Sequence, residues 1–410
     1  MRIAITLAVA VALLASAAQA APLTYGQALD TAAANAPSLR AAALQVEAAR
    51  ASARAAGALP DPKLALGLDN FPVSGPPAGR FGADEMTMGR VGYSQDIPSA
   101  AKRQARIGRA QADIVAAGAD GAVEARQVRV AAALAWIELL YAQRKLAALD
   151  RVLAQLDPLW SAAPSGVAAG RSRPAQALEA AQMRAALQDR RSEAVSELGR
   201  ARAALTRWTG DPDSQAIGQA PDLDLHPATL RAAIDRNPAL LARDAAARQA
   251  QADVALAKAD KRPDWSWEVA YQRRDPMFGD MVSAGVSVSL PLWGKSRQDP
   301  MIAARAASAG RADAQREDAR RALTAQLESD LADHVMHHEQ WLRARDTLLP
   351  LAQQRADLET AGYGAGTAAL PDVLAAFAGL SDAQLTTLDR EAAVAIDAAR
   401  LSLTYGSDDQ

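Results

Sequence analysis

The 410-residue sequence contains no cysteine, and only 4% of its residues are aromatic. We therefore expect neither disulfides, nor thiolate metal sites, nor a lipid attached to an N-terminal cysteine. An aromatic-rich core is not expected either, and the abundance of alanine favours helices packed closely through small side chains. The formal net charge of −2 provides no basic field, so nucleic acid is not an expected partner.

Long apolar runs are missing beyond the N-terminus. Arg2 is followed by an apolar run over residues 3–17 and then by Ala-Gln-Ala at 18–20, with small residues where signal peptidase requires them. This pattern predicts a signal peptide at residues 1–20 and an exported mature chain that begins at Ala21. No later segment approaches 18 uninterrupted apolar residues, so a membrane crossing by the mature chain requires strands.

Two strands joined by a turn are predicted at residues 265–273 and 281–290, because apolar and polar residues alternate in both. Each arm is about ten residues long, as a tilted membrane-spanning strand requires. A second, less apolar hairpin is predicted at residues 63–71 and 86–97. The alternative is a core position in a soluble β-domain, but the alternation favours lipid-facing side chains at Trp265, Trp267, Val269 and Tyr271.

Most of the remaining chain has helical composition. A helix from residue 99 to about residue 156 would span roughly 80 Å, which is too long for a globular core and favours a coiled coil or a helical barrel. A turn is predicted at residues 158–174 and a returning helix at residues 175–208. Short sequence motifs at the ends of these predicted helices and strands recur, in the same order, about 200 residues later. We therefore predict two structural repeats, at residues 21–210 and 211–410.

Each repeat runs short helix, helix, strand, strand, long helix, turn, helix. Two hairpins supply four strands, whereas the smallest closed membrane barrels have about eight. An open sheet would leave unpaired backbone groups in hydrocarbon. Three copies would supply twelve strands. The predicted fold is therefore mainly α with a membrane β part: a helix-strand-strand-helix duplication whose trimer forms a 12-stranded β-barrel on a long periplasmic α-helical barrel.

The sequence resembles the TolC family of outer-membrane channel proteins. The resemblance rests on this duplicated plan and on three motifs: Asp-Pro-Lys-Leu at residues 61–64, Ser-Leu-Pro-Leu-Trp-Gly at 289–294, and Gly-Thr-Ala-Ala-Leu-Pro-Asp-Val-Leu at 366–374. Residues 59–72 and the compact length are similar to the heavy-metal-efflux branch, the CzcC and CusC type. The resemblance implies a homotrimer in the outer membrane, with a large periplasmic portion. It also implies docking to a periplasmic membrane-fusion adaptor and an inner-membrane resistance-nodulation-division (RND) pump.

Such a channel needs a gate instead of a catalytic group or a cofactor. Asp372 matches an acidic residue that faces the pore in the family, Gln176 is its counterpart in the first repeat, and Glu179 lies one turn further on. A ring of carboxylates would concentrate cations. The alternative role of Asp372 is to interact with the positive end of a helix dipole. In the predicted turn between the two helices of the first repeat, Arg171 and Arg173 are candidate adaptor-docking residues.

His334, His337 and His338 share one helix face, where neutral imidazoles bind zinc, copper or nickel. The alternative is a polar helix surface, and the charged run at residues 311–321 is expected to be another. Three functions remain open: an exit duct for heavy-metal cations, a multidrug or type I secretion duct, and a soluble periplasmic coiled-coil adaptor or structural protein. An enzyme is disfavoured because no nucleophile–base or phosphate-binding constellation is recognisable.

Overall fold

A computed structural model describes residues 22–168, 173–221 and 225–406. The predicted signal peptide and Arg171 lie outside the described residues. The chain divides into two compact units. Unit 1 combines residues up to 36 with 127–226 and 329–404, and unit 2 combines 37–126, 227–328 and the residues from 405 onward. Each unit thus draws on both halves of the sequence, and the division into repeats at residue 210 stays a prediction.

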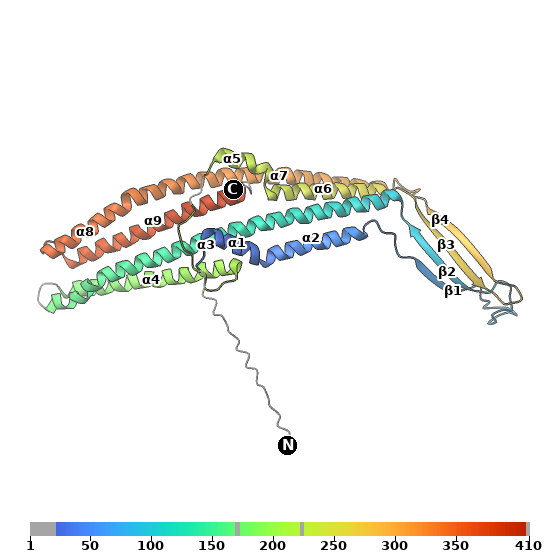
Figure 1. Cartoon of the computed structure of the whole chain (residues 1–410), viewed down its shortest axis with the longest axis horizontal. Coiled ribbons are helices and arrows are strands. Elements are labelled where there is room, and N and C mark those ends of the chain that lie inside the picture. Colours follow the sequence, from blue (N-terminus) through green and yellow to red (C-terminus); the bar gives the residue numbers. More distant parts are fainter. Residues whose placement is uncertain (1–21, 169–172, 222–224, 407–410) are drawn as a thin grey trace, which may run out of the picture. The chain divides into compact units, whose positions relative to one another are not determined.

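The order of elements in the first half is repeated in the second, as predicted (Figure 1). The first half contains α1 (Tyr25–Asn35), α2 (Pro37–Ala55), β1 (Lys63–Asp69), β2 (Met88–Ile97), α3 (Ala100–Ala168) and α4 (Pro174–Thr209). The second half contains α5 (Pro227–Ala233), the short 3-10 helix η1 (Ile234–Arg236), α6 (Pro238–Ala259), β3 (Asp264–Arg273), β4 (Met281–Ser289), α7 (Gln298–Arg343), the π-helical η2 (Ala344–Leu348), α8 (Leu349–Ala365) and α9 (Leu370–Tyr405).

The helix α3 is longer than predicted, because it continues through Pro158 and Pro164 where we expected a turn. A proline inside a helix costs about 3 kcal/mol, since it removes a hydrogen bond and its ring crowds the preceding turn. Leu156 and Trp160 are buried here in one apolar cluster with side chains of α4 and α9. Burial of a large apolar side chain contributes about 1.5–3 kcal/mol. Tertiary packing therefore offsets the energetic cost of these prolines, and the helix continues where the sequence pattern suggested a turn.

The corresponding long helix of the second half is interrupted. Between α7 and α8, the N–H of Leu349 donates to the carbonyl of Ala344, which is the wider spacing of a π-turn. Pro350 follows immediately and has no N–H to donate to the carbonyl four residues earlier. We attribute the π-turn to this proline, because a locally wider turn accommodates its ring.

The start of the described chain is fixed against α3 within unit 1. Trp136 on α3 donates its indole N–H to the carbonyl of Leu23 at 2.8 Å, and its ring meets Tyr25 edge-on. Leu23 also pairs with Ala216 as a β-bridge. The helix α1 then begins with a capping box between Thr24 and Gln27, which satisfies two of its otherwise free N–H groups.

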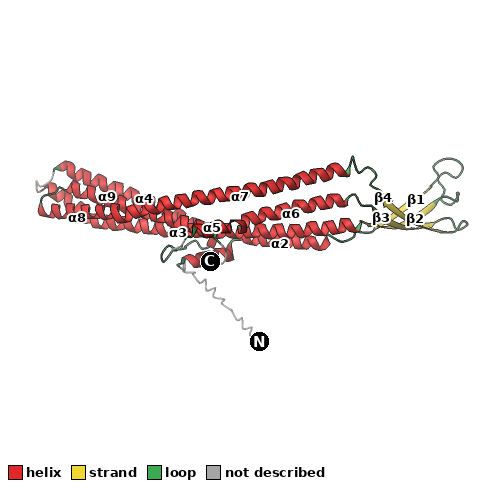
Figure 2. Cartoon of the chain, turned by 90° about the horizontal axis from the view of Figure 1, so that it is seen from above, coloured by secondary structure: helices red, strands yellow, loops and turns green. Residues whose placement is uncertain are grey.

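Within the described residues, the four strands form one antiparallel sheet in the order β1-β2-β3-β4, and helices make up most of the rest (Figure 2). The two predicted hairpins are joined through β2 and β3, where Tyr93 pairs with Val269. The strand β1 ends two residues earlier than predicted, because Asn70 adopts a left-handed conformation with φ of 55°. No helix in the described part of the chain is long and apolar enough to cross a membrane.

Candidate functional site

One side of the sheet is apolar across all four strands except at Gln95 and Arg273. Residues directly opposite each other in an antiparallel ladder project to the same side, and the register aligns Leu66, Val91, Tyr271 and Val282. We call this side the apolar face. It comprises Leu64, Leu66, Leu68, Val91, Tyr93, Trp265, Trp267, Val269, Tyr271, Val282, Ala284, Val286 and Val288.

The side chains of the apolar face are exposed in the single chain. Trp265 is 56% exposed, Val282 is 72% exposed and Leu66 is 73% exposed. A soluble protein rarely leaves so large a contiguous apolar surface uncovered. All four residues predicted to face lipid lie on this face, and Trp267 packs against Tyr93 with ring centroids 5.6 Å apart. That the face contacts lipid stays a prediction.

The opposite side of the sheet is polar and internally bonded. Arg90 on β2 forms an ion pair with Glu268 on β3. The hydroxyl groups of Ser266 and Ser287 lie 2.7 Å apart, and Gln272 donates to Ser283 at 2.9 Å. The sheet therefore combines an apolar side with a polar side. Such a two-sided sheet fits the boundary between hydrocarbon and water.

The two returning helices α4 and α9 begin in the same way. The side chain of Gln176, in the first turn of α4, accepts a hydrogen bond from the N–H of Arg173 at 2.9 Å. Asp372, in the first turn of α9, accepts one from the N–H of Ala369 at 3.2 Å. Both side chains thus satisfy an N–H that the helix leaves free. The predicted counterparts Gln176 and Asp372 share one local structural role, but only Asp372 carries a charge.

Asp372, Glu179 and Arg173 are exposed, and Gln176 is half-buried. The hydrogen bond of Asp372 supports the alternative that its carboxylate stabilises the helix start. The same carboxylate remains open to solvent on its other side. A role in gating or docking for these residues is therefore compatible with the local structure, and it stays a prediction.

Unit 1 contains a network of charged side chains that the sequence did not predict. Lys145 on α3 forms ion pairs with Glu197 on α4 and with Asp389 on α9. Burial by itself would lower the pKa of Lys145, but hydrogen bonds to the two carboxylates raise it above its ordinary value. The two partners lie 52 and 244 residues away along the chain, so no local motif announces them. The network connects three helices beside a cavity of about 500 Å³.

The three histidines of α7 do not gather around one point. The Nδ1 atom of His337 lies 2.6 Å from Asp397 on α9, whereas the rings of His334 and His338 lie 6.2 Å apart on α7. Burial lowers the pKa of His334. Among the described residues, no group of three or more histidine, cysteine or acidic side chains is placed to hold a metal ion. His337 turns toward a carboxylate on another helix, so the predicted three-histidine site is not assembled.

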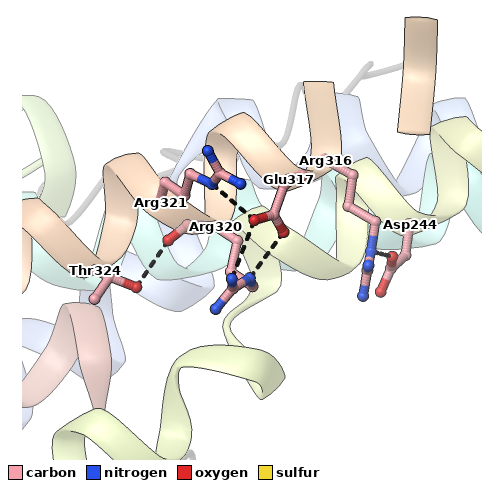
Figure 3. Close-up of polar contacts among 6 residues, drawn as sticks. All are labelled: Asp244, Arg316, Glu317, Arg320, Arg321 and Thr324. Carbon is pink, nitrogen blue, oxygen red and sulfur yellow. Dashed lines mark hydrogen bonds and ion pairs between the residues drawn. The ribbon is translucent and has the colours of Figure 1, made fainter. Parts of the chain in front are cut away.

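The charged run on α7 is a solvated helix face, as expected. The carboxylate of Glu317 accepts hydrogen bonds from Arg320 at 3.0 Å and Arg321 at 2.8 Å, and Arg316 forms an ion pair with Asp244 on α6 (Figure 3). The hydrogen bonds from Arg320 and Arg321 lower the pKa of Glu317 to about 2. These side chains stabilise helix surfaces, and nothing in their arrangement suggests catalysis.

Solved structures with the same fold cover nearly the whole chain. A membrane protein from Pseudomonas aeruginosa has a TM-score of 0.80 and 19% sequence identity, over 93% of this chain and 90% of that chain. A structure of CusC has a TM-score of 0.76 and 17% identity, over 93% and 92%. The Campylobacter jejuni CmeC outer membrane channel has a TM-score of 0.79 and 14% identity, over 93% and 85%. At these identities the likeness concerns the fold.

No curated protein matches the sequence. The family model described as outer membrane efflux protein matches it twice, over residues 28–211 and 229–407. The two matches together include most of the chain and both hairpins of the sheet. This chain therefore belongs to the outer membrane efflux protein family.

Proposed function

We propose that this protein is the exit duct of a tripartite efflux system, set in the outer membrane as a homotrimer. One observation carries the proposal: a four-stranded sheet has an exposed apolar face, a polar opposite side, and edge strands β1 and β4 that have no further partner within the described chain. An open sheet edge is costly in hydrocarbon. Pairing of β1 in one copy with β4 in the next removes both edges.

Three copies arranged in this way form a closed barrel of twelve strands. The apolar face then meets lipid, and the polar side that carries Arg90 and Glu268 meets the water of the pore. The long helices continue into the periplasm as a helical barrel. Conduction is passive, because energy is supplied by an inner-membrane RND pump that a periplasmic adaptor connects to the duct. The family membership and the CusC and CmeC folds support this assembly.

In this proposal, the connections from α3 to α4 and from α8 to α9 form the periplasmic end of the duct. Three copies of Asp372 make a carboxylate ring at the gate, with Gln176 between them and Glu179 one turn away. Arg173, and Arg171 beside it in sequence, provide the positive charge for adaptor docking. A ring of carboxylates concentrates cations. Together with the resemblance to the heavy-metal-efflux branch, this charge favours metal cations as cargo.

Membrane fractionation followed by native mass measurement tests the assembly. We expect the protein in the outer-membrane fraction, resistant to urea extraction, and a mass of three chains in detergent. A monomer in the soluble periplasmic fraction would refute the duct and would favour a periplasmic adaptor or structural protein.

A deletion strain tests the cargo. We expect increased sensitivity to zinc, copper, cobalt or nickel salts, restored by the wild-type gene but not by a copy that lacks the segment 63–97. Unchanged metal tolerance with increased sensitivity to organic antimicrobials would favour a multidrug duct. Loss of a secreted protein from the medium would favour a type I secretion duct.

A further inference from the structure

The connection between β4 and α7, residues 290–297, exposes a second apolar surface. Leu290 is 63% exposed, Leu292 is 75% exposed and Trp293 is 76% exposed. The segment is held as a turn, because the N–H groups of Ser296 and Arg297 both donate to the carbonyl of Trp293. It follows Val288 on the apolar face and lies at the end of the sheet that joins the helices of unit 2 (Figure 1).

Beside this connection lies a cavity of about 440 Å³ whose lining includes Arg262, Arg297, Leu290 and Pro291. Its two acidic residues already have a partner. The ammonium of Lys102 lies 2.5 Å from the carboxylate of Asp264 and 3.9 Å from that of Asp260. The lining thus holds three basic residues and two acidic ones, which gives it a net charge of +1, and both carboxylates are paired with Lys102 and with neither arginine.

Basic residues outnumber acidic ones around this connection. In the described part of the chain, no acidic side chain lies within ion-pair distance of Arg262, Lys295 or Arg297, and all three are exposed. Lys261 is paired with Asp299 in the first residues of α7. Unpaired guanidinium groups favour an oxyanion with several acceptor oxygens. The adjacent leucines and tryptophan favour a ligand that also has an apolar part.

We propose that this end of the sheet binds an anionic phospholipid of the periplasmic leaflet. Arg262 and Arg297 contact the phosphate of the headgroup, while Leu290, Leu292 and Trp293 lie against the acyl chains. The inference rests on the proposed function, since it requires the apolar face to lie in the membrane. Two features favour a lipid over free phosphate: the exposed apolar side chains directly continue the apolar face in sequence, and tryptophan and arginine are residues that favour the membrane interface.

The first experiment measures lipid binding to the purified full-length protein in detergent by native mass spectrometry. Dioleoyl-phosphatidylglycerol and dioleoyl-phosphatidylcholine are titrated separately. We expect the wild type to favour phosphatidylglycerol, and the double variant Arg262→Gln/Arg297→Gln to lose about thirtyfold in affinity for it, because the variant removes two basic residues that each attract the anionic headgroup. The matched control Arg305→Gln/Arg311→Gln, which removes two exposed charges from α7, should keep the wild-type preference.

The second experiment separates a lipid from free phosphate. The variant Leu292→Ser/Trp293→Ser keeps both arginines, and it should bind both lipids more weakly, while an excess of inorganic phosphate should leave the lipid binding of the wild type unchanged. Displacement of the lipid by inorganic phosphate, or equal preference in the two arginine double variants, would overturn the inference. Both outcomes can occur in a wild type that resists urea extraction from the outer membrane, so they are distinguishable from failure of the proposed duct.

Discussion

The two long helices of the molecule occupy the same place in the order of elements but differ in their surroundings. The helix α3 buries many large side chains, among them Trp136, Ile137 and Leu149. In the corresponding stretch of the second half, α7 to α8, the buried residues are the smaller set Ala309, Leu327, Leu331, Ala344 and Ala356. The second helix instead exposes Val335, Leu351 and Leu358.

This difference teaches that a repeated order of elements does not imply repeated packing. The helix α3 contains two prolines and still continues, because side chains of other helices cover it. Fewer side chains are buried in the stretch from α7 to α8, and there the helix accommodates its proline by forming a π-turn. In the single chain, α3 is therefore largely covered, whereas the stretch from α7 to α8 is largely exposed.

The largest effect is expected in the core around α3. Trp136→Ala removes a fully buried ring and its hydrogen bond to Leu23, which should lower the free energy of unfolding by about 3–5 kcal/mol. The change Val335→Ala on α7 should cost about 0.5 kcal/mol or less, because the side chain of Val335 is exposed. Denaturant unfolding of both variants in detergent measures this. Equal losses would remove the distinction between the two helices.

The next largest effect is expected in the sheet, where the first and second hairpins can be compared by placing a charge on the apolar face of each. Val286→Arg in the second hairpin and Leu66→Arg in the first each place a charge on the apolar face, which costs about 2–4 kcal/mol at the bilayer midplane. Ser287→Arg, one residue further on and on the polar side, should be tolerated. The amount of urea-resistant protein in the outer membrane measures the effect. Normal insertion of Leu66→Arg alone would mean that the less apolar first hairpin does not face lipid.

The two helix starts provide a smaller contrast. Asp372→Asn should lower the cation-to-anion permeability ratio of the channel by about two- to fivefold, and Gln176→Glu should raise it, since a unit charge a few ångströms away contributes about 1 kcal/mol. Glutamate at residue 176 retains the hydrogen bond from Arg173, so the helix start is preserved. Reversal potentials in a planar bilayer report the ratio. Identical ratios in all three proteins would exclude these positions from the pore.

The smallest effect concerns the exposed face of α7. Hydrogen bonds from Arg320 and Arg321 lower the pKa of Glu317 from 4.5 to about 2. A depressed carboxylate pKa adds stability above pH 4.5, and this contribution is lost as the pH falls from 4.5 toward 2. The thermal midpoint of Glu317→Gln should therefore fall less than that of the wild type over this range. Glu339→Gln, which removes another exposed carboxylate of α7, serves as the control and should follow the wild type.

Local sequence patterns predicted the elements well where one physical cause dominates. Alternation placed β3 and β4 to within one residue, because a strand with one apolar side has a fixed period of two. The turn predicted at residues 158–174 was wrong for most of its length, because proline signals describe a chain without tertiary contacts.

The sequence by itself determined the order of elements, the two hairpins and the positions of the two helix starts, because each depends on period, proline or capping groups within a few residues. Only the tertiary structure decided how the hairpins join through β2 and β3, that α3 continues past Pro158, and that His337 meets Asp397. It also brought Lys145 to Glu197 and Asp389. These contacts depend on residues that lie far apart in the chain, and burial of apolar surface, which acts on the whole fold, outweighs local preference there.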